Sequence, residues 1–402
     1  MFADRTNWNL TPNALSVALA AYRASGKPLL DLTASNPTEC GFVYNSEAIL
    51  AALANPAALH SEPDPRGLLS ARESVSRYYA ERGDHVPPDG IVLTTSTSEA
   101  YSFVFKLLCN AGDEVLVPQP SYPLFDFLAD LQDVRLARYP LIYDHGWQID
   151  FHAVTQVITP RTRAVIVVNP NNPTGNFCKP QEIAQLNEIC SAHGTAIIAD
   201  EVFLDYSLSE ERPQSFAANQ RALTFTMSGI SKICGLPQMK AAWLVTSGPE
   251  ALRAEALARL EVIADTYLSM SAPIQHALPF MLQTRYAFQP QLVGRVRRNL
   301  AELDRQLAAY KNLPSEESSE RGIWRQLQCE GGWYAVLQLP VNQSSDELAM
   351  RLLKERGVYL HPGHFYEFAG ERFVVVSLIT PAGDFVDGVR ASINCATANQ
   401  HS

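Results

Sequence analysis

The sequence lacks the long apolar segments of a membrane protein. Nowhere in its 402 residues is there a run of about 18 apolar residues, the length needed to cross a bilayer. The first residues also lack the charged stretch followed by an apolar stretch that marks a secretion signal. We therefore expect a cytoplasmic protein that makes no contact with a membrane.

The sequence has no pair of closely spaced cysteines. Its seven cysteines are scattered, odd in number and without a Cys-x-x-Cys motif, which predicts reduced thiols rather than a disulfide framework or a zinc site. His361 and His364 flank a Pro-Gly turn, with no acidic or sulfur ligand beside them. We expect no metal site.

The sequence also has few basic residues relative to acidic ones. The 42 acidic residues exceed the 32 basic ones, which gives a formal net charge of -10 and disfavours binding to nucleic acid or to anionic membranes. The content of 47% hydrophobic and 18% charged residues is typical of a globular protein with a large core. A chain of this length suggests two or three structural units.

From about residue 90, short apolar runs alternate with helical patterns. The predicted strands are residues 91–94, 115–118, 134–139, 164–168, 195–199, 223–227 and 241–245. This alternation predicts an α/β fold, with a mostly parallel sheet of about seven strands covered by helices. Ligands of such sheets gather beyond the carboxyl ends of the strands.

The pattern changes on either side of this region. A helix over residues 12–24, capped by Thr11, and a strand over 29–32 precede it. A helix over 290–310, a loop over 313–320, a strand over 333–339, a helix over 345–356 and a strand over 373–378 follow it. We predict a large domain at 49–283 and a small α+β domain built from 1–48 and 284–402. Within the large domain we expect a helix over 68–82 with Arg72 and Arg77 on its polar face.

Polar residues follow several of the predicted strands, namely Ser96, Tyr122, Asn172, Asp200 and Lys232. Lys232 lies in a strand-ending Ser/Gly loop, where an ammonium would be costly to desolvate and its pKa would fall, which makes the amine a nucleophile for a carbonyl. A solvated surface lysine fits the same segment. The hydroxyls and amides of residues 96–98 open a helix and suit a phosphate, although Ser and Thr are also ordinary helix caps.

Three motifs occur together and in order: Asn172-Pro173-Thr174-Gly175, Asp200-Glu201-Val202 and Ser231-Lys232. With these motifs the sequence resembles the fold type I enzymes that use pyridoxal 5'-phosphate (PLP), and specifically the class I/II aminotransferases of the aspartate aminotransferase-like superfamily. The resemblance covers nearly the whole chain. It implies transfer of an amino group between an amino acid and a 2-oxo acid, and a homodimer with active sites at the subunit interface.

The resemblance also implies roles for individual residues. Lys232 would form the internal aldimine with PLP and move the substrate proton, Asp200 would pair with the pyridine nitrogen, Asn172 would bind the phenolic oxygen, and Tyr122 would stack on the ring. Asn36 would meet the substrate carboxylate. The remaining residues expected around the cofactor, mainly at its phosphate, are Ser96, Thr97, Ser98, Ser231 and Lys240.

The sequence departs from the family pattern at several positions. Phe203 replaces a tyrosine that donates to the phenolic oxygen, which predicts a more basic internal aldimine in a pH titration of the visible spectrum. Lys240 replaces the phosphate-binding arginine and keeps only its charge. Ser61 replaces the tyrosine that reaches the partner subunit's phosphate.

The most consequential departure is Val375, which stands where the family has the arginine that binds the substrate carboxylate. Arg66 and Arg372 are the candidate substitutes, although period-two alternation predicts that Arg372 faces the other side of the strand.

These observations favour a PLP-dependent aminotransferase acting through Lys232. The missing arginine keeps open an alternative, a PLP-dependent cyclase, lyase, decarboxylase or oxidase acting on a modified amino acid in a biosynthetic pathway. A third reading is a non-catalytic PLP-binding protein, but the sequence has no basic helix-turn-helix segment of the kind to which such modules are fused.

Overall fold

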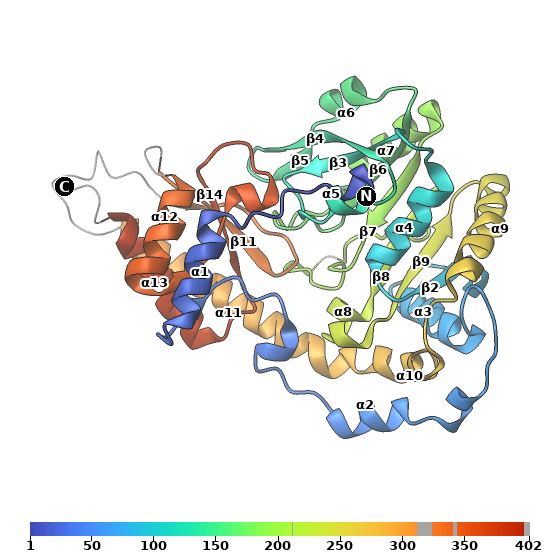
Figure 1. Cartoon of the computed structure of the whole chain (residues 1–402), viewed down its shortest axis with the longest axis horizontal. Helices are drawn as coiled ribbons and strands as arrows, with labels where there is room; N and C mark the ends of the chain where they lie inside the picture. Colours follow the sequence, from blue (N-terminus) through green and yellow to red (C-terminus); the bar gives the residue numbers. More distant parts are fainter. Residues whose placement is uncertain (211, 312–323, 341–343, 398–402) are drawn as a thin grey trace.

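The computed structural model describes residues 1–210, 212–311, 324–340 and 344–397, and shows an α/β fold with a large and a small sheet (Figure 1). Within these residues the large sheet has eight strands in the order β2-β9-β8-β7-β6-β3-β4-β5. Their bounds are β2 Ile91–Thr94, β3 Glu114–Gln119, β4 Arg135–Tyr143, β5 Trp147–Ile149, β6 Thr162–Val168, β7 Ala196–Asp200, β8 Thr224–Gly229 and β9 Ala242–Ser247.

The sheet is mixed rather than wholly parallel. Strands β4, β3, β6, β7 and β8 pair in parallel, whereas β9 is antiparallel to both of its neighbours and β5 is antiparallel to β4. The α/β class is confirmed, and each of the seven predicted strands is present. The additional strand β5 has only three residues, too few for a periodic pattern in the sequence.

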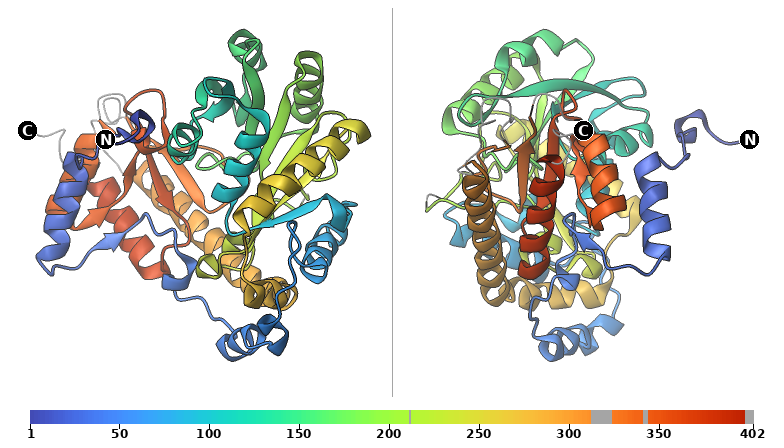
Figure 2. Two further views of the ribbon diagram at one scale, coloured as in Figure 1. Left: turned by 45° about the vertical axis from the view of Figure 1, so that its right-hand side comes forward. Right: turned by 90° about the vertical axis from the view of Figure 1, so that its left-hand side faces the viewer.

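Helices cover both faces of the large sheet (Figure 2). They are α3 Leu69–Glu81, α4 Thr97–Leu108, α5 Phe125–Asp130, α6 Phe151–Val157, α7 Pro180–His193, α9 Glu250–Tyr267 and α10 Ala272–Gln283. Successive residues of β6 enter different apolar cores, Ala164 and Ile166 on one face and Val165 and Val167 on the other. Burial on both faces explains why the strands are continuous apolar runs.

The small domain joins the two ends of the chain. Strand β1 (Leu30–Asp31) pairs in parallel with β12 (Val358–Tyr359). A four-stranded antiparallel sheet has the order β10-β11-β14-β13, with β10 at Arg325–Gln326, β11 at Tyr334–Gln338, β13 at His361–Pro362 and β14 at Phe373–Ser377. Its helices are α1 Ala14–Ala24, α11 Arg285–Lys311, α12 Ser345–Arg351 with the π-helical Leu352–Arg356, and α13 Ala382–Thr397. The domain boundaries given above remain predictions.

Several local predictions need correction. Asn13, not Thr11, caps α1, since its side chain accepts a hydrogen bond from the Ser16 amide. Arg72 is buried instead of lying on a polar face, because the preceding loop folds over it and Arg72 donates to Gly67 O at 2.8 Å and to Asp64 at 2.8 Å.

Other segments have a secondary structure that differs from the prediction. Lys232 belongs to the one-turn helix α8 (Ile230–Ile233), directly after β8, and not to an irregular loop. Helix α2 (Ser46–Leu53) was not predicted. The loop predicted at 313–320 lies outside the described residues. No helix in the described part of the chain combines the length and apolar content needed to cross a membrane.

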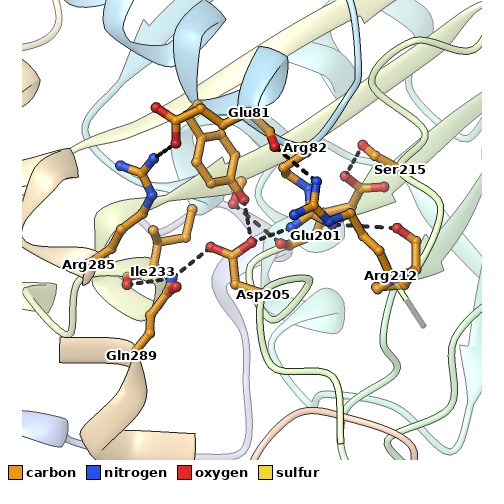
Figure 3. A network of polar contacts seen from close by, with 12 residues as sticks. Glu81, Arg82, Glu201, Asp205, Arg212, Ser215, Ile233, Arg285 and Gln289 are labelled. Atoms are coloured by element: carbon orange, nitrogen blue, oxygen red, sulfur yellow. Dashed lines mark hydrogen bonds and ion pairs between the residues drawn. The ribbon is translucent and has the colours of Figure 1, made fainter. Parts of the chain in front are cut away.

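A buried polar network joins the large domain to α11, the helix that continues from α10 toward the small domain (Figures 1 and 3). Asp205, after β7, accepts hydrogen bonds from Arg82 at 2.5 Å, Tyr78 at 3.0 Å and Gln289 at 2.7 Å. Gln289 on α11 also donates to the carbonyl of Ile233 at 3.1 Å. The network therefore links α3, α11 and the helix that carries Lys232.

Replacement of Asp205 by alanine tests this link. The side chains of Arg82 and Asp205 are 10% and 8% exposed, so the substitution leaves a desolvated guanidinium without its carboxylate. We expect the free energy of unfolding, measured by urea denaturation, to fall by about 3–5 kcal/mol. Glu255→Ala removes an ion pair whose side chains are 66% and 58% exposed, and should cost less than about 1 kcal/mol. Equal losses in the two variants would contradict a structural role for the network.

Candidate active site

Four of the residues singled out in the sequence lie at the ends of four neighbouring strands. Lys232 follows β8, Asp200 ends β7, Asn172 follows β6 and Tyr122 follows β3, and these strands are adjacent in the order β8-β7-β6-β3. Because the strands are parallel, all four residues lie along one edge of the sheet, about 5 Å apart from strand to strand. Ser96 follows β2 at the same edge, on the far side of β9.

Lys232 projects into an aromatic environment. Its Nζ lies 4.8 Å from the ring centroid of Trp333 and 5.7 Å from that of Phe203, and it forms no ion pair with any described residue. Burial lowers the pKa of Lys232 to about 8, and the charge of Asp200 opposes this shift. At pH 7, Lys232 is then a neutral amine in about a tenth of the molecules. An amine of this kind is a competent nucleophile.

Among the described residues, Asp200 has no cationic partner that forms an ion pair with its carboxylate. Tyr101 Oη donates a hydrogen bond to it at 3.1 Å and the Val202 amide donates another at 3.2 Å. Burial raises the pKa of Asp200 to about 6, while these two hydrogen bonds lower it. A cation at hydrogen-bond distance stabilises the charged form of a buried carboxylate. The position of Asp200 therefore suits a protonated ring nitrogen.

Asn172 supplies an unused polar atom at the same edge. Its side chain is buried, and its Oδ1 has no hydrogen-bond partner among the described residues. The turn behind it needs glycine at Gly175, where φ is +74° and a Cβ atom would lie 2.6 Å from Cys329 Sγ and 2.7 Å from Gly331 O. The turn thus holds Asn172 in place with its side-chain oxygen available for a hydrogen bond.

The expected phosphate site lies at the start of α4. Ser96 is its N-cap, and its Oγ accepts from the Glu99 amide at 3.2 Å. The amides of Thr97 and Ser98 lie in the first turn, where backbone amides have no intrahelical acceptor. Ser231 is partly buried in α8. Lys240 is exposed just after the short helix at Pro237–Met239. Helix amides and an ammonium suit a phosphate group.

These residues fit PLP. The uncompensated Asp200, the amine of Lys232, the unpartnered amide of Asn172 and the open first turn of α4 offer what its ring nitrogen, aldehyde, phenolic oxygen and phosphate require. Tyr122 is 45% exposed at this edge. Phe203 is buried and packs edge-on against Trp333, and the consequence predicted for its missing hydroxyl remains a prediction.

The two arginines expected to bind substrate have their contacts away from Lys232, whereas the role of Asn36 remains a prediction. Asn36 lies in the loop after β1, where its Oδ1 accepts from the Thr38 amide at 3.2 Å. Arg66 lies beside β2, where its carbonyl accepts from the Leu93 amide at 2.9 Å. Its guanidinium turns toward the start of β2, where it donates to the carbonyl of Asp89 and lies 3.6 Å from Glu261.

Arg372 lies at the wrong end of its strand. It precedes β14, whereas the residue after the other end of β14, Leu378, donates to the carbonyl of Trp333 beneath Lys232. Ser377 is five positions after Arg372, about 16 Å along the strand. Within this chain, neither Arg66 nor Arg372 occupies the place of the missing arginine.

Sequence reasoning missed three aromatic residues of the site. Trp333 lies beneath Lys232, Tyr101 donates to Asp200, and Tyr206 Oη donates to the carbonyl of Lys232 at 2.5 Å. Tyr101 lies one turn after the residues expected to bind phosphate, so helical periodicity was a usable signal for it. The contact of Trp333 with Lys232 depends on how the two sheets pack, and that of Tyr206 depends on the path of the loop after β7. The sequence reveals neither.

Comparison with known proteins agrees with this fold and site. Residues 27–382 match the family model described as aminotransferase class I and II. The glutamate-pyruvate aminotransferase AlaA of Escherichia coli K12 is 31% identical over 255 residues, which are 63% of this chain and 63% of AlaA. An alanine aminotransferase of Mycobacterium tuberculosis H37Rv is 29% identical over 266 residues, 65% of this chain and 62% of that protein. The chain thus aligns with less than two thirds of the length of these relatives.

Solved structures extend the similarity over nearly the whole chain. An alanine aminotransferase from Pyrococcus furiosus superposes with a TM-score of 0.85 at 20% identity, covering 99% of this chain and 100% of that one. A double mutant of Thermus thermophilus aspartate aminotransferase gives 0.82 at 21% identity, covering 98% and 99%. At these identities the structural likeness shows only that the fold is shared. The match to the family model shows that the chain is related to the family. The chain therefore belongs to the class I and II aminotransferase family.

Proposed function

We propose that this protein is a PLP-dependent aminotransferase that moves an amino group between an amino acid and a 2-oxo acid, with Lys232 as the reacting amine. Members of the family use PLP. The observation that carries the proposal is the placement of Lys232, with its lowered pKa, beside an unpaired Asp200 at the ends of adjacent strands. Transamination needs both an amine that gains and loses a proton near neutral pH and a carboxylate for the ring nitrogen.

Each residue has a defined task in this proposal. When bound, PLP supplies an aldehyde that reacts with primary amines and a ring that withdraws electrons from the substrate Cα. Lys232 Nζ, in its amine form, would take the proton from the substrate Cα and hold it for return. Asp200 keeps a proton on the ring nitrogen, Asn172 orients the phenolic oxygen, and Tyr122 covers one ring face. The first turn of α4, with Ser231 and Lys240, holds the phosphate.

Substrates, assembly and location belong to the same proposal. The names of the relatives, glutamate-pyruvate aminotransferase and alanine aminotransferase, make glutamate, alanine and pyruvate the first compounds to test. A homodimer is supported by exposed apolar side chains on and near α2, at Val43, Leu50, Leu59 and Leu69. We place the protein in the cytoplasm, where thiols such as its seven free cysteines stay reduced.

A second candidate function rests on Val375. Without an arginine to fix the substrate carboxylate, the bond aligned for cleavage at Cα can differ, which favours a lyase, decarboxylase, cyclase or oxidase. Product analysis separates the candidates, since only transamination converts the donor stoichiometrically into its 2-oxo acid while the cofactor becomes pyridoxamine phosphate.

Replacement of Lys232 by alanine tests the proposal. The PLP-incubated variant should lose the visible absorption band of the enzyme-bound cofactor and at least about 1,000-fold of its transamination rate with glutamate and pyruvate, because the general base is gone. Lys106→Ala is the matched control, since Lys106 is an exposed lysine on α4 that donates to Gln132. A Lys232→Ala variant that keeps both the band and the activity would refute the assignment.

The lowered pKa of Lys232 predicts a pH dependence. In protein freed of PLP, modification of Lys232 by trinitrobenzenesulfonate, located by peptide mass mapping, should rise with pH with a midpoint at pH about 8, because only the amine reacts. The charge of Asp200 raises this pKa, so Asp200→Asn should move the midpoint to lower pH. A midpoint near 10.5, the ordinary lysine value, would show that Lys232 is solvated.

A further inference from the structure

A pocket lies at the amino ends of the large-sheet strands, away from Lys232. It has a volume of about 480 Å³, and its lining comes from the starts of β6, β7 and β8, from the ends of α4 and α7 and from the start of α9. Asp200 and Lys232 stand at the other ends of β7 and β8. We call it the rear pocket, because it is opposite the candidate active site. Its lining includes Leu108, Arg163, Arg221, Ala222, Leu223 and Leu252.

The loop before β8 forms a fixed wall of the rear pocket. Ser191 Oγ, on α7, donates to the carbonyl of Arg221 at 3.0 Å. A Cβ atom on Gly248, where φ is +125°, would lie 2.7 Å from the Ala222 carbonyl oxygen, so glycine is needed for the turn before α9 to pack against this loop. These contacts hold the wall in place without a ligand, and the rear pocket is therefore preformed.

The walls of the rear pocket are mainly apolar. Leu108 comes from the end of α4, Leu223 from the loop before β8, and Leu252 from the first turn of α9. Leu252 is 49% exposed. An apolar side chain that lines a pocket and still contacts water is stabilised by a ligand that covers it.

The charged residues of the rear pocket are both basic. Within the described part of the chain, Arg163 and Arg221 line it and no Asp or Glu does. Cys190, which also lines it, is a neutral thiol, because burial raises its pKa to about 12. Arg163 is already paired, with its Nε 2.9 Å and its Nη2 3.2 Å from the carboxylate of Asp113. The guanidinium of Arg221 makes no hydrogen bond or ion pair with another described residue, so its donors are available to an anion.

These features together suit one class of small molecule. A guanidinium binds a carboxylate through two parallel hydrogen bonds, and apolar walls bind an apolar body. A pocket of about 480 Å³ is within the range of ligand sites and is too large for alanine or pyruvate to fill. An uncharged apolar molecule would cover Arg221 without pairing with it, and an inorganic anion would leave the leucines in contact with water.

We propose that the rear pocket binds a carboxylic acid with an apolar body, at a site separate from Lys232. The carboxylate pairs with Arg221, and the apolar body lies against Leu108, Leu223 and Leu252. This binding does not depend on the proposed aminotransferase function, because the rear pocket and Lys232 are at opposite ends of β8.

Calorimetric titration of the PLP-loaded protein with 4-benzoylbenzoate tests the role of charge. This compound joins a carboxylate to an aromatic ketone, and 4-benzoylbenzamide is its uncharged analogue. We expect the acid to bind at least about 10-fold more tightly than the amide, and Arg221→Gln to abolish this difference, because the acid then loses its counter-ion. Arg259→Gln is the matched control, since Arg259 is a 66% exposed arginine of α9 that pairs with Glu255 outside the pocket. It should leave both affinities unchanged.

Leu252→Asp tests the apolar wall. An aspartate at this position removes apolar contact and repels the carboxylate, so the acid should bind at least about 10-fold more weakly than to the wild-type protein. Unchanged binding would overturn the placement of the apolar body. Should Leu252→Asp fail to fold, the comparison of acid and amide in the wild-type protein and in Arg221→Gln still decides the outcome.

Photolabelling locates the bound acid. On irradiation the benzophenone group of 4-benzoylbenzoate inserts into nearby C–H bonds, and peptide mass mapping should find the label at Leu108, at Leu252 or within residues 221–223. Label at Tyr122 or Trp333 alone would place the acid in the candidate active site and overturn the proposal. Equal affinity of the wild-type protein for acid and amide, or an unchanged preference in Arg221→Gln, would overturn it as well. The aminotransferase assignment stands apart from these outcomes, since Lys232→Ala tests it.

Discussion

Burial where β8 and β7 end desolvates Lys232 and Asp200, and no ion pair within the described part of the chain compensates either of them. Desolvation makes the charged form of each group less stable, so the lysine tends toward its amine and the carboxylate is left in need of a cation. Holding two such groups on adjacent strands is costly for a fold. The buried parallel strands on either side, and the network that ties α8 to α11 through Gln289, keep them in place.

The small domain completes the environment of these groups. Trp333 lies beneath the amine, and the end of β14 reaches it through the hydrogen bond from Leu378 to the Trp333 carbonyl. The N-terminal segment also bridges the domains, since Trp8 donates to Asp130 at 2.8 Å and packs on Phe127. The chemistry proposed for the large sheet therefore depends on contacts from the small sheet. A change in the packing of the two domains would alter the environment of Lys232.

Much of this was predictable from the sequence, and the reasons for success and failure are physical. Strands buried on both faces leave continuous apolar runs, so β6, β7 and β8 and the polar residues after them could be placed. The environment of Arg72 could not, because its burial depends on a loop that folds back over α3. The register of His361 opposite Val375 was also hidden, because β13 has only two residues and carries no periodic signal.

The most direct measurement is to identify the residue to which the cofactor attaches. The protein is incubated with PLP, reduced with borohydride, which makes the attachment permanent, and digested for peptide mass analysis. We expect one pyridoxyl group per chain, on Lys232, and none in an Asp200→Ala, Lys232→Ala double variant. A pyridoxyl group on Lys240 or another lysine, with Lys232 unmodified, would contradict it.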